Sequence, residues 1–385
     1  MPSFSNFSWR ITTLIVAGIV AATVQSSPSR PYFLARKDSP LDQAVLQPAS
    51  PIKQDHTGAA RGYAPFLPGD FTYPVYRNVK SYNAVGDGNA DDTQNLQNAI
   101  NNDGNGGSRY NDELDLRLHT ILVGDPNNMP TFEASSDFNG GTVVNGYGYA
   151  THDSSGTTAF FIAMKNIIID TTSVAPDTTV LALQWGVAQA CQLTNIKINM
   201  PTDSKGHIGI ALDQGSTTAV TDVTIVGGAV GIRNSDQQVN FKSISFSKCT
   251  TGISVTGGFV AVIQHAKFDT CGLGIDGGSG GPPGSIIILD STSTNSGPVI
   301  KYHDSSNDGR DRNNQIVIEN PSHDGGNPIA VDSKGDTKLG GDQTVAPTSF
   351  STVRRSGPSS TARSARATTA PPRSVERTAS RIKRG

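Results

Sequence analysis

A short internal repeat in the middle of the chain restricts its fold more than any other feature. The segments VTIVGGAVGI (223–232), ISFSKCTTGI (244–253) and AKFDTCGLGI (266–275) align without gaps. Each has apolar residues at alternate positions followed by Gly-Ile, and the Gly-Ile pairs begin at residues 209, 231, 252 and 274. These spacings of 22, 21 and 22 residues are typical of a solenoid. Because apolar residues alternate within each unit, we expect the units to be strands.

The repeat predicts an all-β fold, a right-handed parallel β-helix in which each unit forms one coil. The inward Ile, Val and Phe side chains of one coil then stack on those of the next. Cys249 and Cys271 each come three residues after an aligned Phe, which places them in one column on neighbouring coils. Neighbouring strands lie about 4.8 Å apart, within the range of a disulfide. A buried column of small side chains and a disulfide are both compatible with this placement.

Composition and charge divide the chain of 385 residues into an acidic body and a basic tail. The chain has 41 Gly, and 17% of its residues are charged, which favours a soluble, glycine-rich β protein. Residues 346–385 hold nine Lys and Arg against one acid, Glu376. This tail has few large apolar residues, so we expect it to be disordered. Binding of the tail to a polyanion is an alternative.

The N-terminus has the pattern of a secretory signal peptide. Arg10 precedes the apolar run ITTLIVAGIVAATV (11–24), and small residues follow. The run is short for a membrane span and suits a signal peptide over 1–26, with a membrane anchor as the alternative. We therefore expect a secreted, extracellular protein with no membrane association after cleavage. A Pro- and Ala-rich leader or propeptide (27–72) would precede the β-helix domain (73–345).

The three cysteines do not indicate a metal centre. Cys191, Cys249 and Cys271 are too few for a disulfide scaffold, and no Cys/His cluster has the spacing of zinc ligands. The sequence therefore predicts neither a metal nor another cofactor.

The stretch VKSYNAVGDGNADDTQNLQNAI (79–100) contains an acidic, glycine-rich turn before a short amphipathic pattern. A calcium loop of the EF-hand type is excluded, because Asp92 and Asn98 stand where such a loop needs Gly and Glu. A phosphate loop is excluded, because the turn lacks the Gly-Lys-Ser/Thr ending. We interpret the turn as structural, with Asp91 or Asp92 capping a helix that begins near Thr93.

This stretch resembles the opening motif of the pectate-lyase-3 class of right-handed β-helices. Four further segments are similar to the first domain of the fungal exo-β-1,3-glucanases of glycoside hydrolase family 55. They are VGDPNNMPTFEAS (123–135), LQWGVAQACQLTNIKINM (183–200), GHIGIALDQGS (206–216) and VGIRNSDQQVNFKSISFSKC (230–249). The resemblance covers about residues 73–341. It implies a glycoside hydrolase that releases glucose from β-1,3-glucan, a cell-wall polysaccharide, with inversion.

Three departures from this family affect the expected activity. The family has two β-helix domains, each with its own GDG and DDT motif, whereas this sequence has one copy. The general acid of the family is a Glu in the second domain, and none of the four Glu residues here lies in a matching segment. The strand that should follow the helix is replaced by the charged SRYNDELDLR (108–117). We therefore expect weak or no hydrolysis by this chain alone.

Glycoside hydrolysis usually needs two carboxyl groups on opposite sides of the scissile bond. No pair in this sequence is fixed by spacing to face each other, and we expect most of the candidates to be exposed singly at turns. These candidates are Asp170, Asp213, Asp222, Asp236, Asp269, Asp276 and Asp290.

The resemblance implies a set of polar residues that contact sugar in the first domain. Amide side chains hydrogen-bond to sugar hydroxyls or position a water molecule, and the alternative for each is a structural role at a coil corner. The candidates are Gln189, His207, Asp213, Gln214, Gln237 and Gln238. A structural role is the stronger interpretation for His207, and Trp185 is expected in the core. No catalytic residue can be assigned.

Three functions remain open at this stage. The first is a secreted, glucanase-like β-helix protein that acts on β-1,3-glucan as a monomer, without a nucleic-acid partner. The second is a non-catalytic glucan-binding or structural β-helix. The third is a pectin-active enzyme, although the Asn-Thr-Asp and Gly-His-Gly motifs of polygalacturonases are absent and RIK (381–383) lies in the tail.

Overall fold

The computed structural model describes residues 76–87, 90–101, 114–116, 120–146, 156–278, 284–302, 316–324 and 326–341. It also gives the backbone of four short strands outside these ranges, β1, β2, β26 and β27. The predicted signal peptide, leader and basic tail otherwise lie outside the described residues, so their boundaries stay predictions.

One face of the molecule is a 10-stranded sheet, parallel except at its last pair. Its strands in spatial order are β4 (Leu114–Asp115), β7 (Gly141–Asn145), β9 (Val180–Gln184), β11 (His207–Leu212), β13 (Val230–Asn234), β15 (Thr251–Val255), β18 (Leu273–Gly277), β21 (Ile300–Tyr302), β24 (Ala330–Val331) and β25 (Thr337–Leu339).

The other strands form a 17-stranded sheet that is mostly parallel. They are β1 (Ile19–Ala21), β2 (Phe33–Leu34), β3 (Tyr76–Asn78), β5 (Ile121–Val123), β6 (Thr131–Ala134), β8 (Ala163–Asp170), β10 (Cys191–Asn199), β12 (Thr217–Val226), β14 (Gln238–Ser247), β16 (Val260–Gln264), β17 (Lys267–Asp269), β19 (Ser285–Leu289), β20 (Thr292–Thr294), β22 (Ile316–Glu319), β23 (Ser322–His323), β26 (Thr348–Thr352) and β27 (Thr368–Thr369). The helices are η2 (Val79–Tyr82), α2 (Thr93–Asn101) and η3 (Gly156–Thr158).

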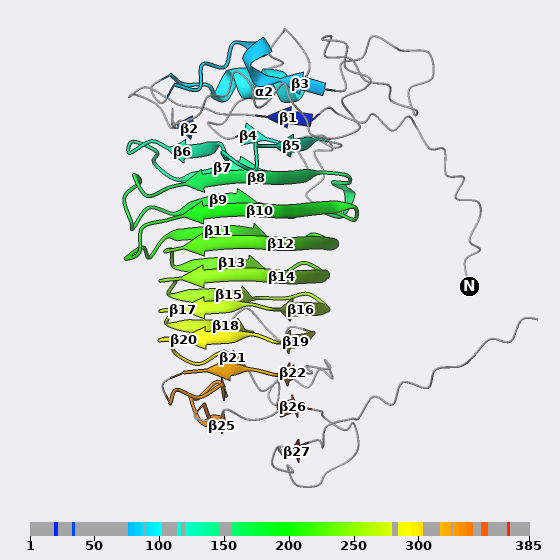
Figure 1. Ribbon diagram of the computed structural model, residues 1–385, viewed down its shortest axis with the longest axis vertical. Coiled ribbons are helices and arrows are strands. Elements are labelled where there is room, and N and C mark those ends of the chain that lie inside the picture. The colour runs from blue at the N-terminus through cyan, green and yellow to red at the C-terminus, as the bar shows by residue number, and fades with distance from the viewer. Residues whose placement is uncertain are drawn as a thin grey trace, which may run out of the picture.

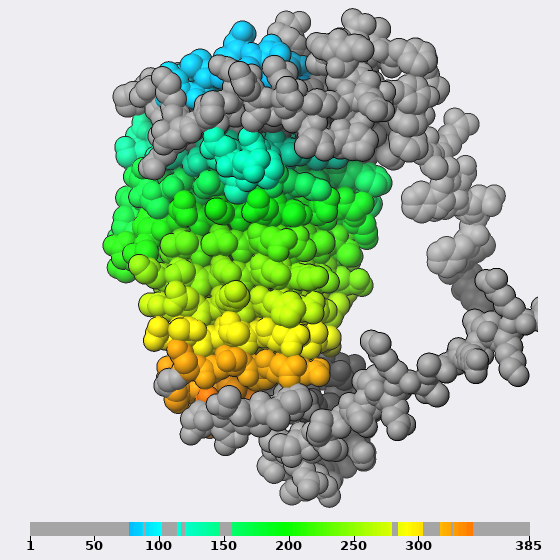
Figure 2. All heavy atoms as spheres, viewed as in Figure 1, coloured from blue at the N-terminus to red at the C-terminus, as the bar shows by residue number. Residues whose placement is uncertain are grey.

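The chain alternates between the two sheets once per coil. It passes from β11 to β12, then to β13 and β14, and each strand pairs in parallel with its counterpart one coil away. The coils stack in chain order along the long axis, below α2 and β3 (Figure 1). In space-filling view they form one continuous elongated body (Figure 2). The predicted parallel β-helix is confirmed.

A column of left-handed residues bends the 17-stranded sheet at the same point of seven successive coils, from β8 to the turn after β22. Six of its seven members are Asn, Asp or His, the side chains that tolerate positive φ best. They are Asn166, Asn195, Asp222, Ser243, His265, Asp290 and Asn320, with φ between 50° and 57°. Within the column, the side chain of Asn195 donates to that of Asn166 at 2.9 Å. The bend gives each coil two strand directions on this side, so the coil closes around a core.

The Gly-Ile repeat has a packing explanation. Ile210, Ile232 and Ile253 are in register on neighbouring strands and fully buried. A Cβ on Gly231 would lie 2.6 Å from a ring carbon of Phe246, and a Cβ on Gly252 would lie 2.7 Å from a ring carbon of Phe268. Glycine therefore recurs where the opposite strand contributes a large side chain to the core.

Phe246 and Phe268 lie in register on β14 and β17, with ring centroids 5.3 Å apart and planes 6° from parallel. Cys249 and Cys271 follow on the same two coils. Both are buried and free, and the amide of Gly272 donates to the carbonyl of Cys249 at 3.1 Å. In the structure, therefore, the cysteine column consists of buried thiols.

Two neighbouring aspartates stabilise the turn before α2 through different hydrogen bonds. The exposed Asp91 accepts a hydrogen bond from the amide of Thr93 at 3.0 Å. The fully buried carboxylate of Asp92 accepts from the amides of Val85 and Gly86, each at 2.7 Å. The carbonyl of Asp92 accepts from Leu96 at 2.9 Å. The side chain of Asp92 thus holds the glycine turn, while its backbone begins the helix.

Replacing Asp92 by alanine is expected to lower the free energy of unfolding by about 2–4 kcal/mol, because three hydrogen bonds, from Val85, Gly86 and the side chain of Asn95, are lost at a buried residue. Asp91→Ala is the matched control and should cost about 1 kcal/mol or less, because its single bond is exposed. Urea denaturation followed by circular dichroism measures both. Equal losses in the two variants would contradict the assigned role of Asp92.

The structure corrects one expectation about the N-terminal coil. The sequence SRYNDELDLR was expected to replace a strand, but β4 (Leu114–Asp115) lies within it and pairs in parallel with β7. Leu114 and Leu116 are buried. Two leucines separated by one residue are enough to place a short strand on the core, and the surrounding charges concealed this pattern.

Candidate functional site

The turns that lead from the 10-stranded sheet to the 17-stranded sheet stack along one edge of the solenoid. We call residues 185–190, 213–216, 235–237 and 256–259 the turn edge. Backbone hydrogen bonds join each turn to the next: Ser216 donates to Val187 at 3.0 Å, Gln237 to Gly215 at 3.1 Å, and Phe259 to Gln237 at 2.8 Å. The turn edge is therefore a stack of single turns, each joined to the next by backbone hydrogen bonds.

The turn edge brings together most of the residues that the sequence suggested. Gln189, Gln214 and Gln237 are exposed on three successive turns, and Gln238 is exposed at the start of β14. The next turn presents Phe259, whose side chain is 65% exposed. Since neighbouring strands lie about 4.8 Å apart, these turns present a row of amides that ends at an aromatic ring.

Two more exposed aromatic residues lie at the start of the neighbouring coil. Phe160 and Phe161 lie just before β8, separated from it by Ile162, and both are partly exposed, with ring centroids 6.1 Å apart. The amide of Ala188 donates to the carbonyl of Ala159 at 2.9 Å, which joins this segment to the turn that holds Gln189. The row of amides thus has aromatic rings near both ends.

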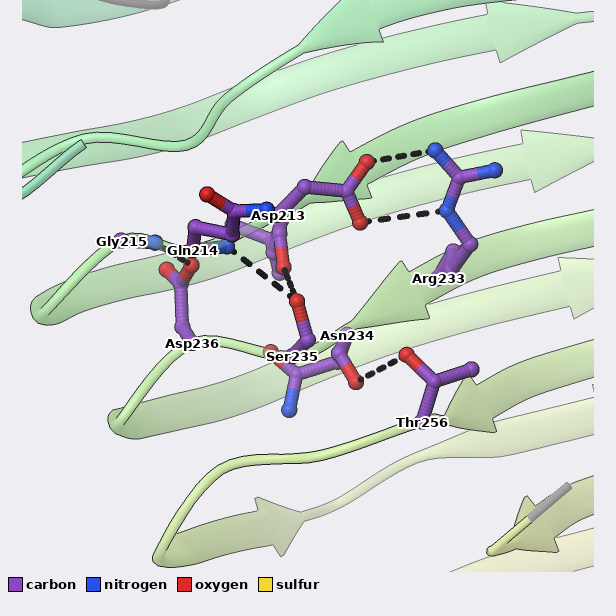
Figure 3. A network of polar contacts seen from close by, with 9 residues as sticks. Asp213, Gln214, Gly215, Arg233, Asn234, Ser235, Asp236 and Thr256 are labelled. Carbon is purple, nitrogen blue, oxygen red and sulfur yellow. Dashed lines mark hydrogen bonds and ion pairs between the residues drawn. The ribbon is translucent and has the colours of Figure 1, made fainter. Parts of the chain in front are cut away.

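Asp213 does not stand free at the turn edge. The guanidinium of Arg233 binds its carboxylate with two hydrogen bonds, from Nε to Oδ1 at 3.1 Å and from Nη2 to Oδ2 at 2.5 Å (Figure 3). Both side chains are partly exposed. The fork geometry fixes the carboxylate in place, so Asp213 is committed to Arg233 and is not a free group at the turn edge.

Asp236 belongs to the turn edge, but it is fully buried. Its Oδ1 accepts a hydrogen bond from the amide of Gly215 at 2.7 Å (Figure 3), and its Oδ2 is buried with no hydrogen-bond partner among the described residues. Burial raises the pKa of this carboxyl from 3.8 to about 7; the bond from Gly215 opposes the rise, and the nearby Asp213 adds to it. The carboxyl therefore titrates near neutrality.

His207 lies at the opposite end of β11 from Asp213, about 20 Å along the strand. It is fully buried, its Nε2 donates to the carbonyl of Ala175 at 3.0 Å, and its Nδ1 accepts from the hydroxyl of Thr171 at 2.9 Å. Burial lowers the pKa of the imidazole. The structure thus separates His207 from the other five candidates and gives it a structural role at a corner.

The expectation that most of the aspartates would be exposed is wrong. Only Asp222, Asp269 and Asp290 are exposed and Asp236 is buried, while the other three are half-buried. Sequence reasoning also missed Phe259. The sequence contained a signal for this exposed ring, because an aromatic residue directly after Gly257 and Gly258 is expected in a turn rather than in a core strand. Trp185 is fully buried, as expected, and its Nε1 donates to the hydroxyl of Thr218 at 3.3 Å.

Within the part of the chain that the structure describes, no group of three His, Cys, Asp or Glu side chains could hold a metal ion. Among the same residues, no helix is long and apolar enough to cross a membrane.

Taken together, the coils and the turn edge define a pectate-lyase-like parallel β-helix with a polar, aromatic-flanked edge. Residues 76–276 match the family described as rhamnogalacturonase A/epimerase, pectate lyase-like, and the chain belongs to that family.

Two relatives share similarity over most of this chain. Glucan endo-1,3-beta-glucosidase BGN13.1 of Trichoderma harzianum is 32% identical over 358 residues, which are 86% of this chain and 43% of the relative. Glucan 1,3-beta-glucosidase of Cochliobolus carbonum is 29% identical over 376 residues, which are 87% of this chain and 46% of the relative. The chain thus spans less than half the length of these relatives.

Among solved structures, the A-module of the Azotobacter vinelandii mannuronan C-5 epimerase AlgE6 aligns with a TM-score of 0.42 and 13% identity. The alignment covers 68% of this chain and 91% of that module.

Proposed function

We propose that this chain binds β-1,3-glucan along the turn edge. The observation that carries the proposal is the row of exposed amides on successive turns, with exposed aromatic rings near both ends. Amides exchange hydrogen bonds with sugar hydroxyls, and the flat apolar face of a pyranose packs against an aromatic ring. The names of the two relatives supply the polysaccharide class. We also propose that the protein acts outside the cell, because its N-terminus has a signal-peptide pattern.

We propose weak or no hydrolysis by the chain alone. Inverting hydrolysis needs a protonated acid and a second carboxylate across the sugar. At the turn edge, Asp213 is held by Arg233 and Asp236 is fully buried. Asp213 is thus already bound to a cation, and Asp236 has no exposed oxygen to offer a sugar. We propose that the relatives take this acid from the part of their length that this chain does not match.

Titration calorimetry with laminarin tests the binding, and an assay for released glucose tests the hydrolysis. We expect binding without appreciable glucose release. Gln214→Ala and Phe259→Ala should each weaken binding about fivefold to twentyfold, since each removes one contact worth about 1–2 kcal/mol. Lys205→Ala, at an exposed ion pair on the opposite corner, is the control and should not change the affinity.

Each other outcome of this experiment has a defined meaning. Robust glucose release would contradict the missing acid. Lack of laminarin binding would contradict the proposed function, and binding of polygalacturonate in its place would assign the edge to pectin. If Lys205→Ala and Gln214→Ala lost affinity equally, the glucan would not bind at the turn edge.

A further inference from the structure

The buried carboxyl of Asp236 supports the turn that carries Gln214. The amide of Gly215 donates to its Oδ1 at 2.7 Å, and the preceding amide, that of Gln214, donates to the hydroxyl of Ser235 at 3.2 Å. Gln214 itself is left-handed, with φ of 62°. Two successive amides of this turn are therefore held by two successive side chains of the turn below, and the side chain of Gln214 is left exposed.

The turn lies directly against the carboxyl. A Cβ on Gly215 would come within 2.5 Å of Oδ1 of Asp236 and within 2.5 Å of the carbonyl oxygen of Val187. Only glycine allows the backbone to approach both atoms. Oδ2 of Asp236 is buried without a hydrogen-bond partner among the described residues. If the carboxyl loses its proton, none of these residues therefore stabilises the negative charge on Oδ2.

Within the described ranges, few charged or titratable groups surround Asp236. On the turn above, Asp213 raises the pKa of its carboxyl, and Arg233 is committed to Asp213 by two hydrogen bonds. Cys191 at the start of β10 is a buried thiol, and the negative charge of Asp236 contributes to its raised pKa. The turn below, residues 256–259, has the sequence TGGF and offers no titratable group. Among the described residues around it, no cation is free to compensate an ionised Asp236.

We propose that Asp236 is a positioning residue for the glucan-binding turn: its protonated carboxyl keeps the turn closed with Gln214 in place, and loss of the proton opens the turn. This inference rests on the proposed function for its ligand. An ionised carboxylate in this site lacks hydration and is repelled by Asp213, and water reaches it only if the 213–216 turn moves away. Glucan binding is then coupled to protonation of Asp236.

Laminarin affinity measured at about pH 5 and about pH 8 tests the coupling in the full chain. If only the protonated form holds Gln214 correctly, and its pKa is about 7, affinity should fall about tenfold between these pH values. In Asp236→Asn the side-chain oxygen still accepts the hydrogen bond from Gly215, but the side chain does not titrate. The laminarin affinity of this variant should therefore change less than twofold over the same pH range. Asp203→Asn removes an equal charge at the opposite corner and should keep the tenfold loss.

Amide hydrogen exchange of the peptide that contains residues 213–217 gives a reading that needs no glucan. Relative to Asp236→Asn at the same pH, the wild-type turn should exchange faster at about pH 8 and equally fast at about pH 5. The inference is overturned if Asp236→Asn shows the wild-type loss of affinity, or if the two proteins exchange alike at both pH values. If neither protein binds laminarin at about pH 5, the proposed function fails, and the exchange experiment still decides the role of Asp236.

Discussion

Gly252→Ala is expected to lower the free energy of unfolding by about 3 kcal/mol, because its methyl group has no space in the core. A Cβ at this position would lie 2.7 Å from the carbonyl oxygen of Gly274 and 2.7 Å from a ring carbon of Phe268. The carbonyl belongs to the neighbouring strand β18, so the clash displaces backbone and disturbs the strand pairing as well as the ring. Urea denaturation followed by circular dichroism measures the loss.

Gly257→Ala is the matched control for the loss of a glycine. A Cβ there would meet only Ser235, at 3.4 Å, which is an ordinary contact, so the change should stay within about 0.5 kcal/mol. Gly252→Ala combined with Phe268→Leu should be less destabilised than the sum of the two single variants, because the smaller side chain relieves part of the clash. Strict additivity would show that the ring and the glycine do not share space.

The same contact explains why the fold was predictable from sequence. Gly231 and Gly252 recur because Phe246 and Phe268 occupy the space of their missing side chains, so the repeat in the sequence directly reflects the packing. Alternating apolar residues then indicated strands, and a period of 21 or 22 residues indicated one coil per unit. The left-handed column also has a sequence signal, as at Asn166 and Asn195, but it is readable only once the register is known.

The candidate site could be predicted only in part. Gln214 and Gln237 lie in turns, where polar residues are exposed, so their placement on one edge followed from the coil period. Asp236 lies in a similar polar turn, and nothing in the local sequence SDQQ distinguishes its buried side chain from the exposed glutamines beside it. Alternation fixes side-chain direction along a strand but not at a corner, where each φ and ψ is set by the turns above and below.

Asp236→Asn is expected to stabilise the protein at about pH 8 by up to about 4 kcal/mol, because the folded state no longer holds a buried negative charge. The carboxyl of Asp236 has a pKa of about 7 in the folded protein, raised by burial from 3.8. Between these values the folded state binds a proton that the unfolded state has lost. The contribution of this group to stability therefore falls as pH rises from about 4 to about 7 and is constant above that range.

Urea denaturation at intervals between about pH 4 and about pH 8 measures this contribution as the difference between the wild type and Asp236→Asn. The difference should be smallest near pH 4 and should grow until about pH 7, since the variant has no titration at this position. Asp203→Asn, which loses an exposed carboxylate, should keep the wild-type slope because Asp236 is still present. If the free energies of unfolding of the wild type and Asp236→Asn changed in parallel with pH, the buried carboxyl would be ionised at no energetic cost. Water would then reach Oδ2 in the closed turn.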